Sequence, residues 1–240
     1  MIFYIIVGFF LRKEKEENPF FKEYEIAVSQ DDLEKVSTLI EENKIGRSEK
    51  NPFHEDHYTP LTYALRKKSF PIAAYLLAAD SDVWSKDAYG QNAFTILVSS
   101  IGPQDSIADT IEILETLLTK GHRLQTEPGQ WYDPLHQLVR TAISHNFPSL
   151  LKYCQEKGAN LNKPIPYSKG NSFLHELCKQ PRPALEILSL LIELGGNPDL
   201  ENEEGQKPID LIEPQLLALR AFMKEGAMSD YEKKIRALLS

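Results

Sequence analysis

One pattern recurs along this chain and constrains its fold more than any other feature. The letters YCQEKGANLN at 153–162 describe the end of a helix, a glycine and a short extended segment. A glycine just past a helix can close the last turn, because it adopts a left-handed conformation without steric cost. The same shape occurs in LLTKGHRLQ, ending at Gln125, in LLIELGGNPDL near Asp199, and in LLAADSDVWS, where Asp80 replaces the glycine. Repetition at intervals indicates a chain built from similar units.

A second signature follows at a similar interval. A polar residue, then proline or a small residue, then an apolar residue marks the start of a helix. This order begins at Thr59, Asn92, Asp133, Ser172 and Lys207. The residues that follow these five positions are separated by 33, 41, 39 and 35 residues. Each unit is therefore predicted to contain a helix, a short turn, a second helix and an extended turn.

A period near 33 residues with a turn and two helices is typical of the ankyrin repeat, and the sequence resembles that family. The family pattern Asp-x-x-Gly-x-Thr-Pro-Leu-His is visible in SKDAYGQNAFT at 85–95. DPLH at 133–136 and NSFLH at 171–175 match it in part. AVSQDDLEKVSTLIEE at 27–42 resembles one more repeat upstream, and ENEEGQKPIDLI at 201–212 resembles the start of a closing repeat.

The resemblance covers residues 20–220 and implies an all-α ankyrin-repeat solenoid of five to six helix-turn-helix repeats with short hairpin loops. Residues 1–19 then form an N-terminal lead-in or cap, and residues 221–240 a C-terminal helical tail. Before and within this tail, Pro214 can start a helix and Gly226 can end it. The tail is predicted to be a capping helix, and the alternative is a functional signal.

Stacked repeats bury a continuous core, because one helical pair cannot bury its apolar face alone. The recurring apolar residues predicted to form this core are Leu61, Leu76, Leu77, Phe94, Leu117, Leu118, Leu135, Tyr153, Cys154, Leu174, Leu191, Ile192 and Ile209. His136 and His175 match a family histidine that links neighbouring loops by hydrogen bonds, so the resemblance implies a structural role for both.

The repeats depart from the family pattern at several points. Only three positions, Gly90, Gly170 and Gly205, hold the family's hairpin glycine. His57 and Trp131 stand where two others would be. Extra residues also occur in two segments, 98–109 and 163–170.

The charge balance narrows the classes of partner. The formal net charge is -8, with 13 basic and 20 acidic residues in positions 1–120 and 14 and 15 in positions 121–240. An acidic chain without a basic run argues against nucleic-acid binding. The two cysteines, Cys154 and Cys178, lie in apolar helix-like segments and are predicted to be buried free thiols of a reducing, cytoplasmic compartment, with a disulfide as the alternative.

The apolar start MIFYIIVGFFL, residues 1–11, is too short to span a membrane, which takes about 20 apolar residues. It also lacks the preceding basic segment of a secretory signal. We interpret it as a hydrophobic cap or a disordered lead-in, and weak contact with a membrane surface is the alternative. Such a membrane-tethered adaptor is one of the functional hypotheses for this chain.

No catalytic motif is complete. His54 and His57 flank two carboxylates, but no third and fourth metal ligand is evident. HELCK at 175–179 resembles the zinc-protease motif HExxH and fails at Lys179. We therefore expect no enzyme activity, cofactor or metal. The alternative is an enzyme with an unrecognised site formed by the insertions at 98–109 and 163–170.

The resemblance implies a non-catalytic protein–protein interaction scaffold that binds through hairpin tips and concave helix faces. The matching positions, and thus the predicted partner-binding residues, are Arg66, Lys67, Lys86, Tyr89, Gln91, Trp131, Tyr132, Arg140, Lys169 and Lys179. Tyr89, Trp131, Tyr132 and Arg140 are the preferred anchors, because aromatic residues and arginine dominate interface energies. Two simpler interpretations remain: Trp131 fills the gap of the missing glycine, and Arg66 to Lys68 form a solvated helix end.

A basic inner stripe on an acidic, monomeric protein favours a partner with an acidic segment. The size of the chain and its Lys, Glu and Asn content are also similar to effectors that intracellular bacteria deliver into host cells. That similarity suggests a host protein as the partner.

Overall fold

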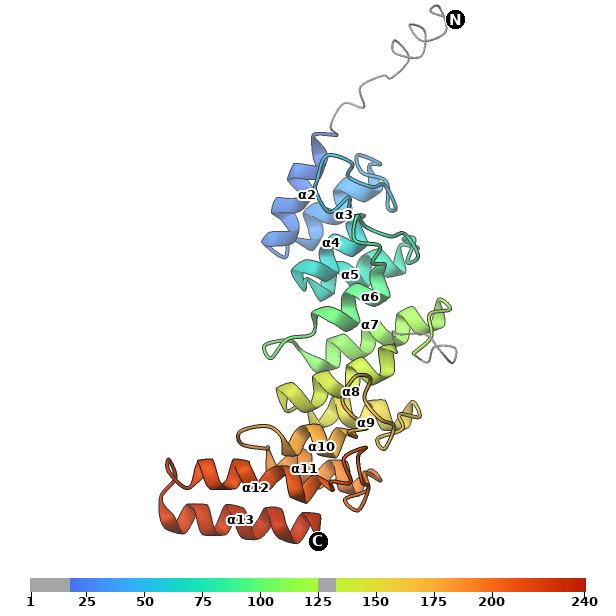
Figure 1. Ribbon diagram of the computed structural model, residues 1–240. Coiled ribbons are helices and arrows are strands. Elements are labelled where there is room, and N and C mark those ends of the chain that lie inside the picture. Colours follow the sequence, from blue (N-terminus) through green and yellow to red (C-terminus); the bar gives the residue numbers. More distant parts are fainter. Residues whose placement is uncertain (1–17, 125–132) are drawn as a thin grey trace, which may run out of the picture. The chain divides into compact units, whose positions relative to one another are not determined.

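The computed structural model describes residues 18–124 and 133–240, which form α-helices and no β-strand (Figure 1). Among them, unit 1 holds residues 18–100 and 112–122, and unit 2 holds residues 101–111, 123–124 and 133–240. Each unit consists of helical pairs packed side by side. The predicted all-α repeat architecture is confirmed.

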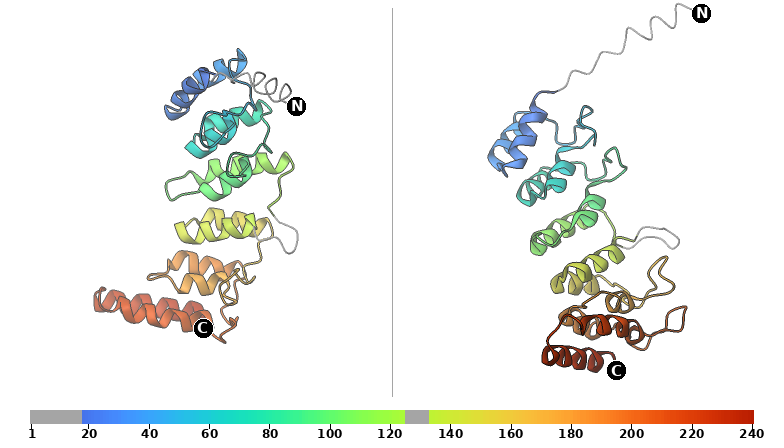
Figure 2. Two further views of the ribbon diagram at one scale, coloured as in Figure 1. Left: turned by 45° about the horizontal axis from the view of Figure 1, so that its top comes forward. Right: turned by 60° about the vertical axis from the view of Figure 1, so that its left-hand side comes forward.

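Unit 1 begins with two complete helical pairs. Its helices are α2 (Phe20–Ser29), α3 (Leu33–Glu41), α4 (Pro60–Lys67), α5 (Phe70–Ala78), α6 (Ala93–Ser100) and the part of α7 (Ile107–Thr119) from Glu112 onward. The first helices of successive repeats pack on one another, α2 on α4 and α4 on α6, while α3 packs on α5. The extended segments that join the pairs lie together on one side of the unit (Figure 2).

Unit 2 repeats the arrangement. Its helices are α8 (Pro134–His145), α9 (Pro148–Glu156), α10 (Phe173–Cys178), α11 (Leu185–Glu193), α12 (Pro208–Leu219) and α13 (Glu225–Leu239). Here α8 pairs with α9, α10 with α11 and α12 with α13. The pairs stack through α9 on α11, α11 on α13, and α10 on α12.

The predicted helix starts are confirmed, and side-chain caps explain them. The Thr59 N–H donates to Thr62 Oγ1 at 2.8 Å, and Thr62 N–H donates back to Thr59 Oγ1 at 3.3 Å. Asn92 and Thr95 form the same reciprocal pair, at 2.9 and 3.0 Å. Such a box satisfies amide groups that a helix terminus would leave unpaired.

His175 caps α10 and also joins two loops. Its Nδ1 lies 3.1 Å from the Ser172 amide nitrogen, and its Nε2 lies 2.9 Å from the carbonyl oxygen of Gln206. The predicted loop-linking role is thus confirmed for this histidine. His136 makes no such link within the described residues: its ring packs 4.5 Å from that of Phe173, and its buried Nε2 has no hydrogen-bond partner there.

Most of the predicted core is buried, including both members of the pairs Leu76–Leu77 and Tyr153–Cys154. Three expectations were too strong, because Leu118, Ile192 and Ile209 are only half-buried. In each case the neighbour one position earlier, Leu117, Leu191 or Pro208, is the buried residue. A helix presents only one stripe to its partners, so adjacent residues are not buried equally.

The expected helix boundaries in the tail are wrong. Pro214 lies inside α12 and is exposed. Proline has no N–H to donate to the carbonyl group one turn earlier, and on an exposed face water can bond that carbonyl group instead. Gly226 lies in the first turn of α13 rather than after a helix. The helix α13 packs on α11 and α12 through Met228, Tyr231 and other buried residues.

Both cysteines are buried free thiols, as predicted. Burial raises the pKa of each thiol to about 12, because the charged thiolate is poorly solvated there. A thiol held protonated is a poor nucleophile. Within the described ranges, no helix has the length and apolar character needed to cross a membrane.

Candidate protein-binding surface

A hairpin between α5 and α6 presents Tyr89 at its tip. Asp87 Oδ1 accepts hydrogen bonds from the backbone N–H groups of Tyr89 and Gln91, at 2.8 and 2.9 Å. The carboxylate therefore holds the turn from inside, and the Asp87 side chain is fully buried. The tyrosine side chain is 65% exposed. A large aromatic side chain on a well-anchored turn loses little entropy when it binds a partner.

Arg66 supports this hairpin from α4. Its guanidinium forms an ion pair with Asp87 and donates to Gln91 Oε1 at 3.1 Å. It also lies 5.5 Å from the centre of the Tyr89 ring. The charge that we expected on the binding stripe is thus compensated within the protein. Arg66 orients the hairpin, and its direct contact with a partner stays a prediction.

The other cations of unit 1 are more accessible. Lys67 is exposed at the end of α4, with its Nζ 5.3 Å from the centre of the Tyr63 ring. Lys86 is also exposed, and its backbone carbonyl accepts a hydrogen bond from Lys50 Nζ at 2.6 Å. Gln91 is half-buried because it packs beside Arg66. Lys67, Lys86 and Tyr89 are therefore the three predicted residues of unit 1 whose side chains are exposed to a partner.

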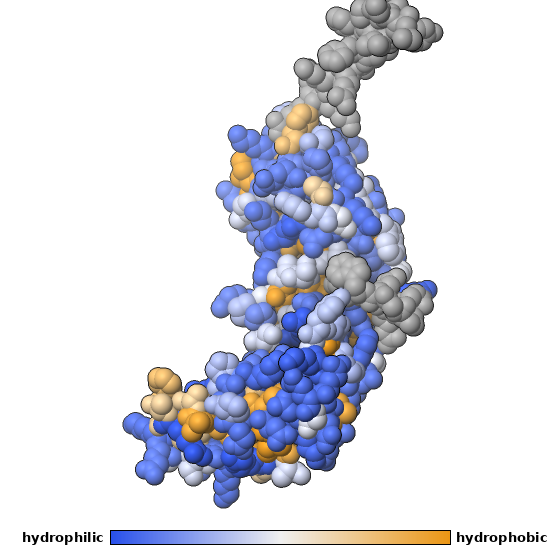
Figure 3. Space-filling view, viewed as in Figure 1, coloured by the Kyte–Doolittle hydropathy of each residue, from blue (hydrophilic) through white to orange (hydrophobic). Residues whose placement is uncertain are grey.

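Unit 2 contains a cavity of about 460 Å³ that brings together two predicted residues, Arg140 of α8 and Lys179 at the end of α10. The segment before α10 forms one wall through Ile165, Pro166, Tyr167 and Ser168. The remaining lining residues are Ile143, Ser144, Phe173, Glu176 and Gln180. The surface over this unit in Figure 3 is mainly hydrophilic, with small groups of apolar side chains between the blue areas.

The two cationic side chains of this cavity, Lys179 and Arg140, differ in whether an acidic group lies beside them. Lys179 Nζ lies 3.0 Å from Glu176 Oε1, and Asn171 Nδ2 donates to the same oxygen at 2.8 Å. Arg140 is exposed and forms no ion pair with any residue that the structure describes. Among the described residues, the cavity therefore offers Lys179 with an ion-pair partner and Arg140 without one, beside an apolar floor.

Lys169 makes contacts within unit 2, and its part in binding a partner stays a prediction. Its Nζ pairs with Glu204 Oε1 at 2.5 Å, and its backbone carbonyl accepts from Glu203 N–H at 3.0 Å. Both contacts join the loop before α10 to the hairpin before α12. The two remaining predicted anchors, Trp131 and Tyr132, lie outside the described residues, so their part in binding stays a prediction.

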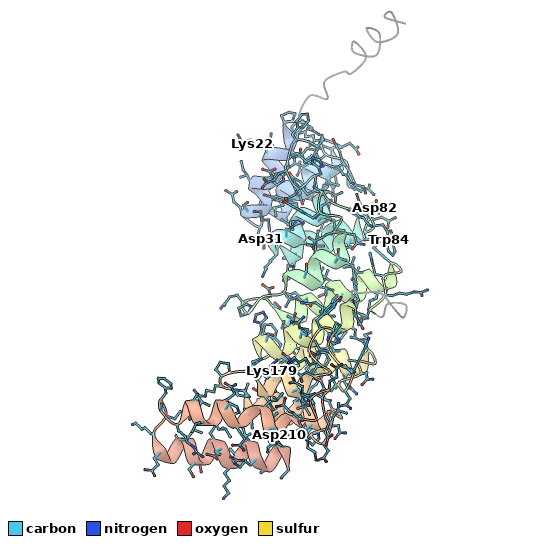
Figure 4. All side chains as sticks on the ribbon, viewed as in Figure 1. Lys22, Asp31, Asp82, Trp84, Lys179 and Asp210 are labelled. Atoms are coloured by element: carbon cyan, nitrogen blue, oxygen red, sulfur yellow. The ribbon has the colours of Figure 1, made fainter. Side chains whose placement is uncertain are left out.

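Sequence reasoning missed Tyr167, whose side chain is fully exposed. It lies between Pro166 and Lys169, in the insertion at 163–170, where no core position of the repeat exists for an aromatic ring. That mismatch was the available signal. Trp84, in the extended segment after α5, is 53% exposed and lies on the loop side of unit 1 with Asp82 (Figure 4).

The described residues contain no group of three or more potential metal-ligating side chains. His54 contacts Asp56, with Nδ1 3.8 Å from Oδ2, and its ring lies 4.9 Å from Tyr58. Among the described residues that line the unit 2 cavity, none is histidine, cysteine or aspartate, and none comes from the insertion at 98–109.

No family model matches the sequence, and no curated protein matches it. Solved structures do match. A chain from the structure of the predatory endopeptidase Bd0816 from Bdellovibrio bacteriovorus in complex with immunity protein Bd3460 aligns with a TM-score of 0.54 and 20% identity, over 83% of this chain and 97% of that one.

Two ankyrin repeat domains match at a similar level. The domain ABAYE2397 from Acinetobacter baumannii AYE has a TM-score of 0.52 and 19% identity, with 90% of this chain and 97% of that chain covered. The human ASB11 ankyrin repeat domain has a TM-score of 0.51 and 20% identity, with 81% and 96% covered. The chain therefore has the ankyrin-repeat fold, an all-α repeat solenoid.

Proposed function

We propose that this protein is a non-catalytic interaction scaffold that binds a partner protein through its hairpin tips and inner helix faces. The observation that carries the proposal is the exposure of Tyr89, Lys67 and Lys86 on elements that internal hydrogen bonds already hold in place. Pre-organised aromatic and cationic side chains are the main source of binding energy in protein interfaces.

The partner of this scaffold carries an acidic segment. Lys67 and Lys86 are exposed cations on a chain with a net charge of -8, so attraction to the partner depends on these two side chains. Electrostatic complementarity of this kind raises association rates and favours one orientation. Nucleic acid is not the partner, because two exposed lysines are too few to neutralise a run of phosphates.

One structural neighbour is a chain from a complex between an endopeptidase and an immunity protein, which fits a fold that serves protein recognition. A host protein is the partner if the chain is an effector delivered into a host cytosol, as its composition suggests.

Affinity capture from a eukaryotic lysate, read by mass spectrometry, tests this function. The test protein carries Lys67→Glu, Lys86→Glu and Tyr89→Ala. The charge-matched control carries Lys22→Glu and Lys234→Glu, two exposed lysines of α2 and α13. Lys22 and Trp84 lie on opposite sides of unit 1 in the view of Figure 4. Helicity of both variants is checked by circular dichroism.

A partner retained by the control and weakened about 30-fold or more in the test protein is expected, since one interface anchor contributes about 2 kcal/mol. Equal retention by the two proteins would place the binding surface elsewhere. Absence of any specific partner, in eukaryotic and bacterial lysates alike, would contradict the scaffold proposal.

A further inference from the structure

Three apolar side chains form the floor of the cavity in unit 2. Ile143, Ile165 and Phe173 line it, and each is buried, with 6%, 7% and 2% of its surface exposed. Its volume of about 460 Å³ falls within the 300 to 1,000 Å³ of ordinary ligand sites. Polar side chains such as Ser144, Ser168 and Gln180 line the rest of the cavity, so the site suits a flat aromatic ring with polar groups beside it.

The rim of the cavity selects the charge of the ligand. Glu176 already compensates Lys179, and the amide of Asn171 holds that carboxylate in place. Arg140 has no such compensation within the described part of the chain. A guanidinium binds a carboxylate through two parallel hydrogen bonds, so this rim accepts one acidic group.

The segment before α10, which forms one wall of the cavity, is a short turn held by internal hydrogen bonds. Ile165 N–H donates to the carbonyl oxygen of Asn171 at 2.8 Å, and Ser168 Oγ donates to the carbonyl oxygen of Ile165 at 2.6 Å. Tyr167 has a φ of +59° at the tip and is fully exposed beside the opening. Its ring can pack against an inserted apolar side chain without any rearrangement of the backbone.

We propose that this cavity binds a short extended segment of a partner protein in which an aromatic residue is followed directly by Glu or Asp. The aromatic side chain lies on the floor formed by Ile143, Ile165 and Phe173, and the neighbouring carboxylate pairs with Arg140. This inference rests on the proposed scaffold function and names the recognition element for one site of it. The size of the cavity, its apolar floor and the Arg140 guanidinium, which has no ion-pair partner among the described residues, together favour that ligand.

Fluorescence anisotropy with synthetic peptides tests the inference directly. The probe is a fluorescein-labelled peptide with Phe-Glu at the centre of a Gly-Ser sequence, and the comparison peptides carry Phe-Gln or Ala-Glu there. We expect saturable micromolar binding of the Phe-Glu peptide, with each comparison peptide weaker by about tenfold or more.

Variants assign the two contacts separately. Arg140→Ala should lower the affinity for the Phe-Glu peptide about tenfold and leave the affinity for the Phe-Gln peptide unchanged. Only the Phe-Glu peptide carries a carboxylate that can pair with Arg140. Tyr167→Ala should weaken both Phe-containing peptides. Lys152→Ala, an exposed lysine on α9, is the matched control and should leave every affinity unchanged.

Absence of Phe-Glu binding at millimolar peptide would overturn the inference, as would an affinity that is the same for Arg140→Ala and wild type. Either result, combined with a captured partner that depends on Lys67, Lys86 and Tyr89, would leave the scaffold function in place without this site. Specific peptide binding, combined with a captured partner that does not depend on Lys67, Lys86 and Tyr89, would show that the cavity and not the surface of unit 1 is the binding site.

Discussion

At the scale of single residues, His122 illustrates how the fold controls protonation. The imidazole is 7% exposed and lies between two rings, with centroids 3.9 Å from Trp84 and 5.0 Å from Phe94. Burial lowers the pKa of His122, and a hydrogen bond with the backbone of Val83 opposes that effect only in part. The ring is consequently neutral at neutral pH, where its flat faces stack without the cost of a buried charge.

This burial predicts that the protein loses stability as the pH falls. The pKa of His122 is lower in the folded than in the unfolded state, so the unfolded state binds more protons in mildly acidic solution. The free energy of unfolding should therefore be highest above the unfolded pKa of about 6.5 and decrease below it. Urea denaturation between pH 7.5 and pH 5 measures the slope.

Two variants attribute this slope to His122. His122→Phe keeps an aromatic ring in the stack but cannot titrate, so its stability should depend less on pH than that of wild type, after a loss of about 1 kcal/mol for the hydrogen bond to Val83. Burial lowers the pKa of His136 as well, which leaves part of the slope in place. His145→Gln is the control, and an unchanged slope in His122→Phe would contradict the assignment.

At the scale of elements, hairpins in the two units share one hydrogen-bond pattern. Asp87 Oδ1 accepts from the Gln91 N–H at 2.9 Å, and Asn202 Oδ1 accepts from the Gln206 N–H at 2.9 Å. Neighbouring hairpins also bond to one another, as when Glu203 N–H donates to the Lys169 carbonyl oxygen at 3.0 Å. These bonds hold the tips at fixed positions within a unit, which a binding surface requires.

Two glycines of unit 2 separate the effect of backbone conformation from the effect of hairpin contact. Gly170 and Gly205 have φ values of +76° and +70°. A Cβ on Gly170 would lie 2.8 Å from Glu203 Cγ and 3.0 Å from the Glu203 nitrogen, whereas nothing lies within 4 Å of a Cβ on Gly205. Gly205→Ala should cost about 1 kcal/mol for the left-handed backbone alone.

Gly170→Ala should cost at least about 1 kcal/mol more than Gly205→Ala, because the added methyl group must also displace the neighbouring hairpin. Urea denaturation of the two variants beside wild type measures the difference. Equal losses of stability would show that contact between these hairpins contributes little.

The elements also show which features a sequence can predict. Caps such as Thr59 with Thr62 depend on residues three positions apart, so spacing alone locates the helix starts. The hairpin at His57 has φ +46°, which demonstrates that a missing glycine did not remove the turn. Pro214 was predicted to start a helix but lies inside α12. A proline removes one backbone hydrogen bond of the helix, and on an exposed face water can bond the carbonyl group that loses its partner.

The binding residues were harder to predict than the helices. The ion pair that occupies Arg66 joins residues 21 positions apart, and local spacing carries no information on it. The cavity around Arg140 needs the backbone conformation of Tyr167, a left-handed residue inside an insertion that has no counterpart in the repeat pattern. Sequence reasoning therefore predicted candidate binding residues, whose role stays a prediction, but not the shape of the surface between them.

At the scale of the whole molecule, stability in a repeat fold is the sum of local stacking terms. The helix α13 contributes such a term to unit 2. Met228, Tyr231, Ile235 and Leu239 are buried along one stripe, and the Tyr231 hydroxyl donates to the Pro183 carbonyl oxygen at 2.7 Å. The opposite face is exposed and carries charged residues such as Asp230 and Lys233, the distribution expected of a capping helix.

Removal of residues 224–240 should therefore destabilise unit 2 by about 3 kcal/mol or more, because each large apolar side chain contributes about 1.5 to 3 kcal/mol when buried. Hydrogen exchange read by mass spectrometry should show lost protection in α11 and α12, the two helices that α13 covers. Amides of α2 to α5 in unit 1 are the internal reference. Tyr231→Phe, which removes only the hydrogen bond to Pro183, should cost about 1 kcal/mol. If α13 were a separable signal rather than part of the fold, the shortened protein would retain the exchange protection of α11 and α12.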